Sequence, residues 1–367
     1  MRAARRIEKV RKLLADEGLD AIVVRSTTDL QWLTGFEAVF DTEEAHTALI
    51  TADDCIIHTD SRYATAMRTA AAAEGLWRVD DEREAAAAFV ARLLGAAGLS
   101  AGTVAIDAAT PLSLYRAYVE KLADVSFAER SGDILGLRQV KEPEEIERMI
   151  RAQRVAEHAL MEVLEKMHAG QTEAEVSLML EFAMRSRGAQ ELAFANIVAS
   201  GPNSANPHAI PGQRRLSKGD LVVIDYGARV DGYRSDTTRT VCVGAPSDEQ
   251  LRIYNAVKRA NEEVRKVVKA GVTGVEMHEL AERVLAEEGY ANLMGHGLGH
   301  GVGLDIHEEP CLNTRNDQPL PAGAVVTVEP GVYVAGENGV RIEDCGQVTD
   351  DGFENFCTLT HELMVVG

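Results

Sequence analysis

The chain has 367 residues, 46% of them hydrophobic, which predicts two globular domains with ordinary cores. The net charge of −20 argues against nucleic acid and anionic membranes as partners, because both bind a basic surface. No apolar run approaches the ~20 residues that span a bilayer, and the N-terminus shows no signal-peptide pattern. The five cysteines have neither disulfide-framework nor zinc-finger spacings, which predicts free thiols in a cytoplasmic protein.

Residues 1–135 alternate helical and strand patterns, which predicts a compact α/β domain. The expected helices cover residues 5–15, 61–73, 82–94 and 111–122. The expected strands are residues 21–24, a hairpin of 47–51 and 55–58, and segments near 77–79 and 104–107. Because none of these segments carries a cluster of catalytic side chains, we expect the chemistry to lie in residues 136–367.

The second predicted domain, residues 136–367, opens with a helix start at Glu142-Pro143-Glu144-Glu145, where proline and acidic residues suit a first turn. Two similar helix starts follow, at Gly170 to Glu175 and at Gly271 to Glu276. In each, a threonine is placed to cap the helix and a glutamate follows three residues later, the spacing of a capping box. A strand-rich stretch follows each helix, which predicts two similar α-then-β halves.

Two aspartates stand at the ends of predicted strands in the first half. The apolar run 221–224 leads into Asp225, and a second strand carries Asp236. Buried carboxylates on facing strands repel each other, so a cation between them would stabilise both. The alternative is that Asp225 caps a turn and Asp236 pairs with Arg234 or Arg239.

A glycine-rich segment in the second half carries the histidines His296, His300 and His307. Glycine lets the backbone approach a centre closely, and neutral imidazole is the commonest nitrogen ligand of metals. A single histidine in such a segment is more often a hydrogen-bonded structural residue. Three histidines in one short segment favour a metal or catalytic site.

Two glutamates complete the set of candidate ligands. Glu329 ends a predicted buried strand, and Glu343 lies on the next strand, on the same face as Arg341. In a purely structural role, Glu343 would form an ion pair with Arg341. In a functional role, Arg341 would orient a metal-binding carboxylate without itself being a ligand. Four carboxylates and one imidazole are too acidic for a structural zinc site and suit two adjacent divalent ions.

The order of these residues resembles that of the pita-bread metallopeptidases, a family that includes aminopeptidase P, prolidase, methionine aminopeptidase and the metal-free creatinase. The stretches HGLGHGVGLDIHE, VEPGVY and GVRIED carry the resemblance over residues 140–367. Residues 1–135 are similar in size and pattern to the extra domain of aminopeptidase P, prolidase and creatinase. The implied fold is a creatinase/prolidase-like α/β domain at 1–135 and a pita-bread catalytic domain, α+β with a pseudo-twofold axis, at 136–367.

The resemblance also implies a role for each matching residue. The implied metal ligands are Asp225, Asp236, His300, Glu329 and Glu343. Asp225 and Asp236 would hold one ion, and Asp236 and Glu343 would bridge to the second. His208 and His307 would stabilise the tetrahedral intermediate, while Glu329 would also carry a proton to the leaving nitrogen. The supporting positions are His296 in the substrate pocket, Tyr333 and Arg341.

The predicted activity is that of an Xaa-Pro aminopeptidase, a metal-dependent exopeptidase that uses a hydroxide activated by two metal ions. Its substrate would be a peptide with a free N-terminus and proline at the second position. Manganese is the expected metal, although cobalt, zinc and iron accept the same donors. The resemblance also favours a homodimer. The alternatives are an Xaa-Pro dipeptidase (prolidase), a creatinase-like hydrolase and a non-enzymatic binding module.

Cys311 bears on the choice between aminopeptidase and dipeptidase. Some prolidases place an arginine, which would bind the substrate carboxylate, at the position that Cys311 occupies. Glu308 and Glu309 would repel that carboxylate if they faced the pocket, and the stretch Thr59 to Tyr63 resembles one in small bacterial aminopeptidases P. These features favour longer substrates. The opposing possibility is that Arg341, or an arginine of a partner subunit, binds the carboxylate.

Overall fold

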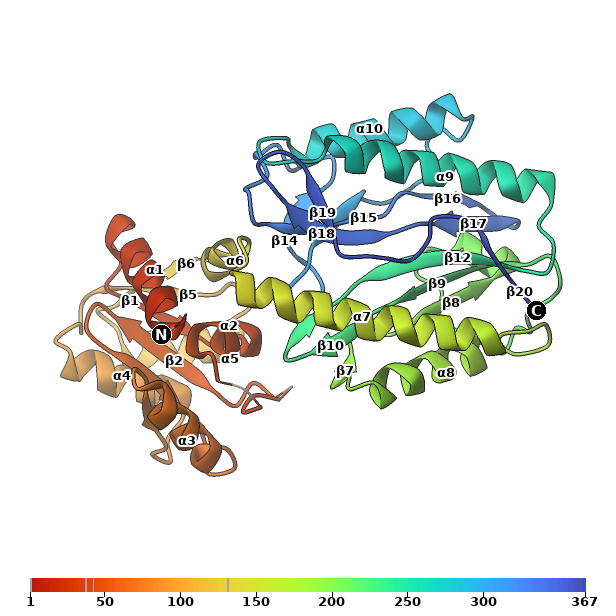
Figure 1. Ribbon diagram of the computed structural model, residues 1–367. Coiled ribbons are helices and arrows are strands. Elements are labelled where there is room, and N and C mark those ends of the chain that lie inside the picture. The colour runs from red at the N-terminus through yellow and green to blue at the C-terminus, as the bar shows by residue number, and fades with distance from the viewer. Residues whose placement is uncertain (1, 37, 42, 131) are drawn as a thin grey trace. The chain divides into compact units, whose positions relative to one another are not determined.

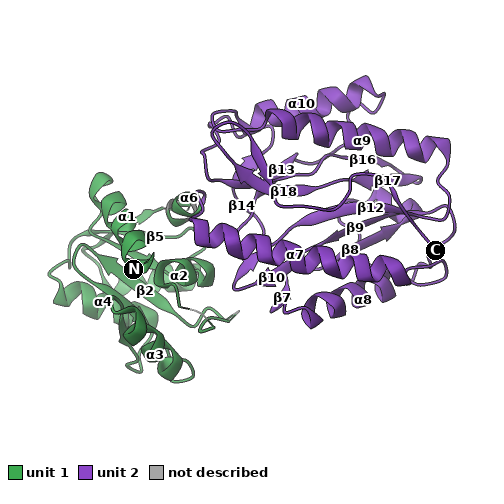
Figure 2. Cartoon of the chain, in the orientation of Figure 1, with its two compact units in different colours: residues 1–138 green, residues 139–367 purple. Residues whose placement is uncertain are grey.

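The computed structural model describes residues 2–36, 38–41, 43–130 and 132–367. The chain divides into two compact units, residues 1–138 and 139–367 (Figure 2). Both units combine helices and strands. Within the described residues, every helix is too short or too polar to cross a lipid bilayer.

The first unit is built on a six-stranded sheet. Its helices are α1 (Arg2–Asp16), α2 (Thr27–Thr34), α3 (Ala64–Glu74), α4 (Ala86–Ala96), α5 (Leu112–Lys121) and α6 (Asp133–Arg138). Its strands are β1 (Ala21–Val24), β2 (Thr47–Thr51), β3 (Cys55–His58), β4 (Arg78–Asp80), β5 (Thr103–Ile106) and β6 (Ser126–Glu129). The strand order is β4-β3-β2-β1-β5-β6, and only β2 runs antiparallel to its neighbours.

Strands β1, β2 and β3 have the bounds predicted from the sequence, and β2 and β3 form the predicted hairpin. The sequence patterns missed helix α2, which is capped by the Ser26 hydroxyl and ended by Gly35 at a φ of 67°. This helix has eight residues, too few to show a clear helical period. Strand β6 was also missed, because its burial does not alternate along the strand.

The second unit contains four long helices and several small sheets. Its helices are α7 (Pro143–Lys166), α8 (Glu173–Ser186), the 3₁₀ helix η1 (Gly201–Ala205), α9 (Asp248–Val267) and α10 (Gly274–Glu287). The strands of its first half are β7 (Glu191–Leu192), β8 (Ile197–Ser200), β9 (Leu221–Tyr226), β10 (Ala228–Val230), β11 (Tyr233–Arg234) and β12 (Thr237–Val243). The remaining strands are β13 (Gly299–Gly301), β14 (Glu308–Leu312), β15 (Val325–Val328), β16 (Gly331–Val334), β17 (Asn338–Arg341), β18 (Asp344–Val348), β19 (Phe353–Asn355) and β20 (Met364–Val366).

The strands of the second unit lie between two pairs of helices (Figure 1). Helices α7 and α8 pack on the sheet of order β20-β12-β9-β8, with Leu160 and Leu180 in one core with Ile224. Helices α9 and α10 cover the sheet of order β14-β13-β15-β18-β19, with Val264 and Val326 in a second core. The unit therefore has two α-then-β halves, as the repeated helix starts predicted.

The repeated capping boxes are formed at both helix starts. The Thr172 hydroxyl accepts a hydrogen bond from Glu175 N at 3.1 Å, and the Thr273 hydroxyl accepts one from Glu276 N at the same distance. Each glutamate carboxylate in turn accepts from the backbone amide of its threonine. These bonds satisfy helix amides that lack a partner within the helix.

Candidate metal centre

Strands β9 and β12 bring the two aspartates together. Asp225 in β9 lies opposite Thr238 in β12, and Asp236 directly precedes β12. Arg341 Nη2 lies 2.7 Å from Asp225 Oδ2, whereas the buried Oδ1 finds no hydrogen-bond partner among the described residues. A buried carboxylate oxygen without a partner is unfavourable unless a cation supplies one.

The two arginines considered as ion-pair partners of Asp236 are bonded to other groups. Arg239 forms an ion pair with Asp344. Arg234 donates to the backbone carbonyls of Ala193 and Leu304. Asp236 is therefore left facing the other carboxylates of the site.

Both glutamates lie where a two-stranded ribbon passes from one sheet to another. Strand β15 pairs with β18 and β16 pairs with β17, but the two pairs belong to different sheets. Glu329 lies in the step between β15 and β16, and Glu343 lies in the step between β17 and β18. We predicted that Arg341 and Glu343 lie on one strand, and the break at 342–343 corrects this. At the break, Glu343 N bonds instead to Thr238 O at 3.1 Å, which turns this residue toward β12.

His300 completes a tight group with the carboxylates. Its Nε2 lies 3.3 Å from Glu329 Oε1 and 3.5 Å from Asp236 Oδ2. Its Nδ1 donates to the Gly301 carbonyl at 3.1 Å, which leaves the Nε2 lone pair directed at the group. One ligand atom each of Asp236, His300 and Glu343 lie within 4.8 Å of one another.

The negative charges of the carboxylates in this group repel one another. Burial raises the pKa of Asp236 well above its ordinary value, and the charges of Asp225 and Glu329 raise it further. Burial and the Asp236 charge likewise raise the pKa of Glu343, and burial raises that of Glu329. Burial lowers the pKa of His300, which favours the neutral imidazole that metals bind. Divalent cations would neutralise the carboxylates, so the donor set fits such ions.

Arg341 supports the centre in a different way from the one predicted. We expected it to orient Glu343, but its guanidinium pairs with Asp225 and donates to Tyr333 Oη at 2.8 Å and to Thr238 Oγ1 at 3.1 Å. The two residues do not share a strand face, because β17 ends at Arg341. Thr238 Oγ1 instead donates to Glu343 Oε2 at 2.8 Å, so Arg341 reaches Glu343 through this hydroxyl.

Tyr333 and His296 form the next layer. The His296 Nδ1 donates to the Gly297 carbonyl at 2.7 Å, so its Nε2 accepts from the Tyr333 hydroxyl at 3.0 Å. Burial lowers the pKa of His296 and raises that of Tyr333 to about 12, so both side chains are neutral near pH 7.

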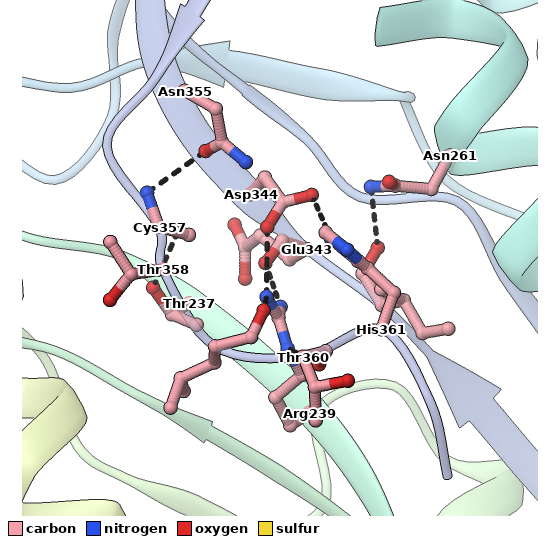
Figure 3. A network of polar contacts seen from close by, with 12 residues as sticks. Thr237, Arg239, Asn261, Glu343, Asp344, Asn355, Cys357, Thr358, Thr360 and His361 are labelled. Atoms are coloured by element: carbon pink, nitrogen blue, oxygen red, sulfur yellow. Dashed lines mark hydrogen bonds and ion pairs between the residues drawn. The ribbon is translucent and has the colours of Figure 1, made fainter.

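A buried polar cluster behind Glu343 was not anticipated from the sequence (Figure 3). Arg239 Nη2 lies 2.9 Å from Asp344 Oδ1, and His361 Nε2 lies 2.7 Å from Asp344 Oδ2. Arg239 also donates to the Glu343 carbonyl at 2.6 Å and to the Thr360 carbonyl at 3.1 Å. Although burial opposes the charged form, Arg239 and His361 hold the pKa of Asp344 well below its ordinary value. The cluster ties residues 359–361 to the strand that follows Glu343.

A cavity of about 520 Å³ opens beside the candidate ligands. All of the predicted site residues except Tyr333 line it, including His208 and His307. The rings of His300 and His307 meet edge to face with centroids 4.4 Å apart. Among the described residues that line the cavity, Arg341 is the only lysine or arginine.

Two of the acidic residues weighed from the sequence do not face the cavity. Glu308 is buried and pairs with Lys141 at 3.1 Å. Glu309 accepts a hydrogen bond from Cys311 N at 3.1 Å and, like Glu308, is absent from the cavity lining. The condition for repulsion of a substrate carboxylate, that these two residues face the pocket, is therefore not met. Cys311 itself does line the cavity.

Comparisons with known proteins connect this geometry to a family. Residues 147–350 match metallopeptidase family M24, and residues 6–140 match the creatinase/prolidase N-terminal domain. An Xaa-Pro dipeptidase of Pyrococcus furiosus is 38% identical over 71% of this chain and 75% of its own length. An X-Pro aminopeptidase structure from Thermotoga maritima has a TM-score of 0.89 at 34% identity, covering 98% of this chain and 99% of its own. An Xaa-Pro dipeptidase structure from Bacillus anthracis has a TM-score of 0.92 at 35% identity, covering 99% of this chain and all of its own.

Proposed function

The chain belongs to metallopeptidase family M24, and from this premise we propose that it is an Xaa-Pro aminopeptidase with a dinuclear metal centre. Family membership makes it a peptidase, and the predicted combination of a creatinase-type N-terminal domain with a pita-bread catalytic domain is confirmed. The observation that carries the proposal is the buried group of carboxylates around His300, where ligand atoms of Asp236, His300 and Glu343 lie within 4.8 Å of one another. Burial, and after it the neighbouring carboxylates, raises the pKa of Asp236 and of Glu343.

We assign the metal ligands to the residues that form this group. They are Asp225, Asp236, His300, Glu329 and Glu343. Two divalent ions held there would supply Lewis-acid activation of water and of the scissile carbonyl. Manganese is the metal we propose, because the donors are mostly hard carboxylate oxygens.

The other side chains act on the substrate. His208 and His307, at the cavity wall, donate hydrogen bonds to the oxygen that becomes negative as the carbonyl is attacked. Glu329, which lines the cavity, accepts the proton of the attacking water and passes it to the departing proline nitrogen. Arg341 fixes Asp225, and the Thr327 hydroxyl donates to Glu329 Oε1 at 3.0 Å, so both carboxylates are held in place.

The length of the preferred substrate separates an aminopeptidase from a dipeptidase. A dipeptidase must bind the proline carboxylate, and a guanidinium is the usual partner. Arg341 is 3% exposed and already engaged with Asp225, Tyr333 and Thr238. The cavity lining within the described residues therefore offers no uncommitted lysine or arginine, which supports longer substrates. The second candidate is an Xaa-Pro dipeptidase, favoured by the activity named for the Pyrococcus and Bacillus relatives.

The experiment that separates the two activities compares kcat/KM for Xaa-Pro and Xaa-Pro-Xaa peptides that share the first residue. An aminopeptidase should favour the longer peptide. A tenfold preference for the dipeptide, worth ~1.4 kcal/mol of transition-state binding, would make the chain a dipeptidase. Amidation of the Xaa-Pro carboxyl group is the control, since it removes the charge and leaves the scissile bond unchanged.

Further parts of the proposal follow from the family resemblance and from the cysteines. We propose that residues 1–135 and 136–367 act as separate domains and that the protein is a homodimer, which light scattering at micromolar concentration tests. We also propose a cytoplasmic location, with which the five free thiols agree.

A further inference from the structure

Glu173, the first residue of α8, has a buried carboxylate that no part of the proposed reaction uses. Its side chain is 1% exposed. Oε1 accepts from Ser200 N at 2.8 Å and from Ser200 Oγ at 2.7 Å. Oε2 accepts from Gly212 N at 3.2 Å, and Asn203 Nδ2 donates to both oxygens at 3.1 and 3.2 Å. One carboxylate thus holds both ends of the segment 200–212.

This segment carries His208 along the cavity wall. Beyond η1 it forms no regular element, and Pro207, Ala209, Ile210 and Pro211 line the cavity beside the histidine. The backbone amide of His208 bonds only within the segment, to Asn206 Oδ1 at 3.2 Å. Two bonds from outside hold the middle of the segment, since Gly339 N donates to Ser204 Oγ at 2.7 Å and Arg341 Nη1 donates to Pro207 O at 3.4 Å. Its two ends are held by Glu173.

A charged anchor suits this place in the fold. Burial of a carboxylate is unfavourable unless hydrogen bonds replace its hydration, and here they come from backbone amides, a hydroxyl and an amide side chain. Glu173 also lies in the first turn of α8, where the partial positive charge of the helix stabilises an anion. The same residue is attached through its backbone, since Glu173 N donates to Arg214 O at 3.1 Å and Ala174 N to Gly212 O at 3.0 Å.

We propose that Glu173 is a positioning residue that fixes the His208 segment against the cavity. The proposal rests on the proposed function of His208. A glutamine in place of Glu173 would present an NH₂ group to donors that now meet an oxygen, so one end of the segment would be released. Displacement of a catalytic group by about 1 Å lowers rates by up to ~100-fold.

The test measures kcat, KM, bound metal and amide exchange in Glu173→Gln. We expect kcat to fall ~10- to 100-fold with little change in KM or metal content, and amides of 200–212 to exchange faster. The control is Glu175→Gln, which removes a charge from the same helix turn but touches only the cap at Thr172. The control should keep wild-type kcat. An equal fall in both variants, or wild-type exchange in Glu173→Gln, would overturn the proposal.

A double-mutant comparison separates this inference from the proposed function. In a His208→Ala background, Glu173→Gln should lower kcat no further, because the group it positions is gone. An undiminished effect there would mean that Glu173 acts elsewhere and would refute the inference. A wild-type kcat in His208→Ala alone would refute the role proposed for His208, whatever Glu173 does.

A milder variant covers the case in which Glu173→Gln does not fold. Asn203→Ala removes two of the hydrogen bonds to Glu173 from an exposed side chain and leaves the helix untouched. Its kcat should fall by a few-fold, in parallel with faster exchange at Gly212. Unchanged values of both would contradict the proposal.

Discussion

Helices α8 and α10 begin alike but hold their neighbours differently. Thr172 and Thr273 form equivalent capping boxes, and each also makes an isolated antiparallel bridge, to Arg215 and to Pro319. The next residue is Glu173 in α8 and Gly274 in α10. The Glu173 carboxylate accepts hydrogen bonds from the segment that carries His208. Gly274, which has no side chain, lets the start of α10 lie close to the backbone of β14.

The contact at Gly274 supports the segment that carries His307. A Cβ at Gly274 would overlap the Cys311 carbonyl oxygen and lie 3.1 Å from Asn316 Cβ. Asn316 holds the same carbonyl through a 2.7 Å hydrogen bond from Nδ2, and Val275 N donates to Asn316 O at 3.0 Å. The two halves thus fix one histidine-bearing segment each, one by a buried charge and the other by the absence of a side chain. The first should be sensitive to lost charge and the second to added volume.

Loss of a carboxylate from the proposed ligand group should have the largest effect, and the effect should be similar in both halves. Asp236→Asn and Glu343→Gln each remove a charge from the ligand group, and we expect activity to fall by more than ~100-fold, beyond the range seen for outer residues of metal sites. Metal analysis should show lower occupancy. The control is Asp231→Asn, an exposed residue paired with Arg151. Full activity of a metal-stripped Asp236→Asn protein would exclude the assignment.

The two histidines should be the next most sensitive positions. His208→Ala and His307→Ala are each expected to lower kcat by ~100-fold, the scale for losing one group that stabilises the transition state. Bound metal should stay at the wild-type level, because neither residue belongs to the assigned ligand set. A parallel loss of metal and rate would make that histidine a ligand.

Gly274→Ala tests the backbone contact directly. The added methyl group has no room beside the Cys311 carbonyl, so we expect the free energy of unfolding to fall by ~1–3 kcal/mol. The control is Gly95→Ala in α4, where a Cβ would meet nothing within 4 Å. Because alanine favours helix over glycine, the control should be neutral or stabilised by up to ~1 kcal/mol. Equal denaturation curves for both variants would show that the close contact is not needed.

The smallest expected effect is shared by the two caps. Thr172→Ala and Thr273→Ala each remove one hydrogen bond to a helix amide, so each should lower the free energy of unfolding by ~1 kcal/mol. Thermal denaturation of the two variants should give similar shifts. A clear difference between them would mean that the helix starts are less equivalent than their hydrogen bonds indicate.

The sequence predicted the parts of the molecule that depend on local pattern. Strands β1 to β3, the capping boxes and the clustering of His300 with the carboxylates all follow from residues close in sequence or from the family motifs. The partners of buried charges were harder to predict. Glu173 bonds to residues 27 to 39 positions away, and Arg341 pairs with Asp225, 116 positions away. Such pairs depend on how segments far apart in the chain pack against each other. No local periodic pattern in a single sequence indicates this packing.

The break in the ribbon has a consequence for cooperativity. Glu329 and Glu343 lie at the joint between the sheet of β15 and β18 and the sheet of β16 and β17. A cation held by both glutamates would therefore join two sheets that the chain itself connects through one short step in each segment. Its binding free energy is available only while both sheets are folded, so it makes their unfolding a single event. The metal-stripped protein should therefore melt over a broader temperature range as well as at a lower one.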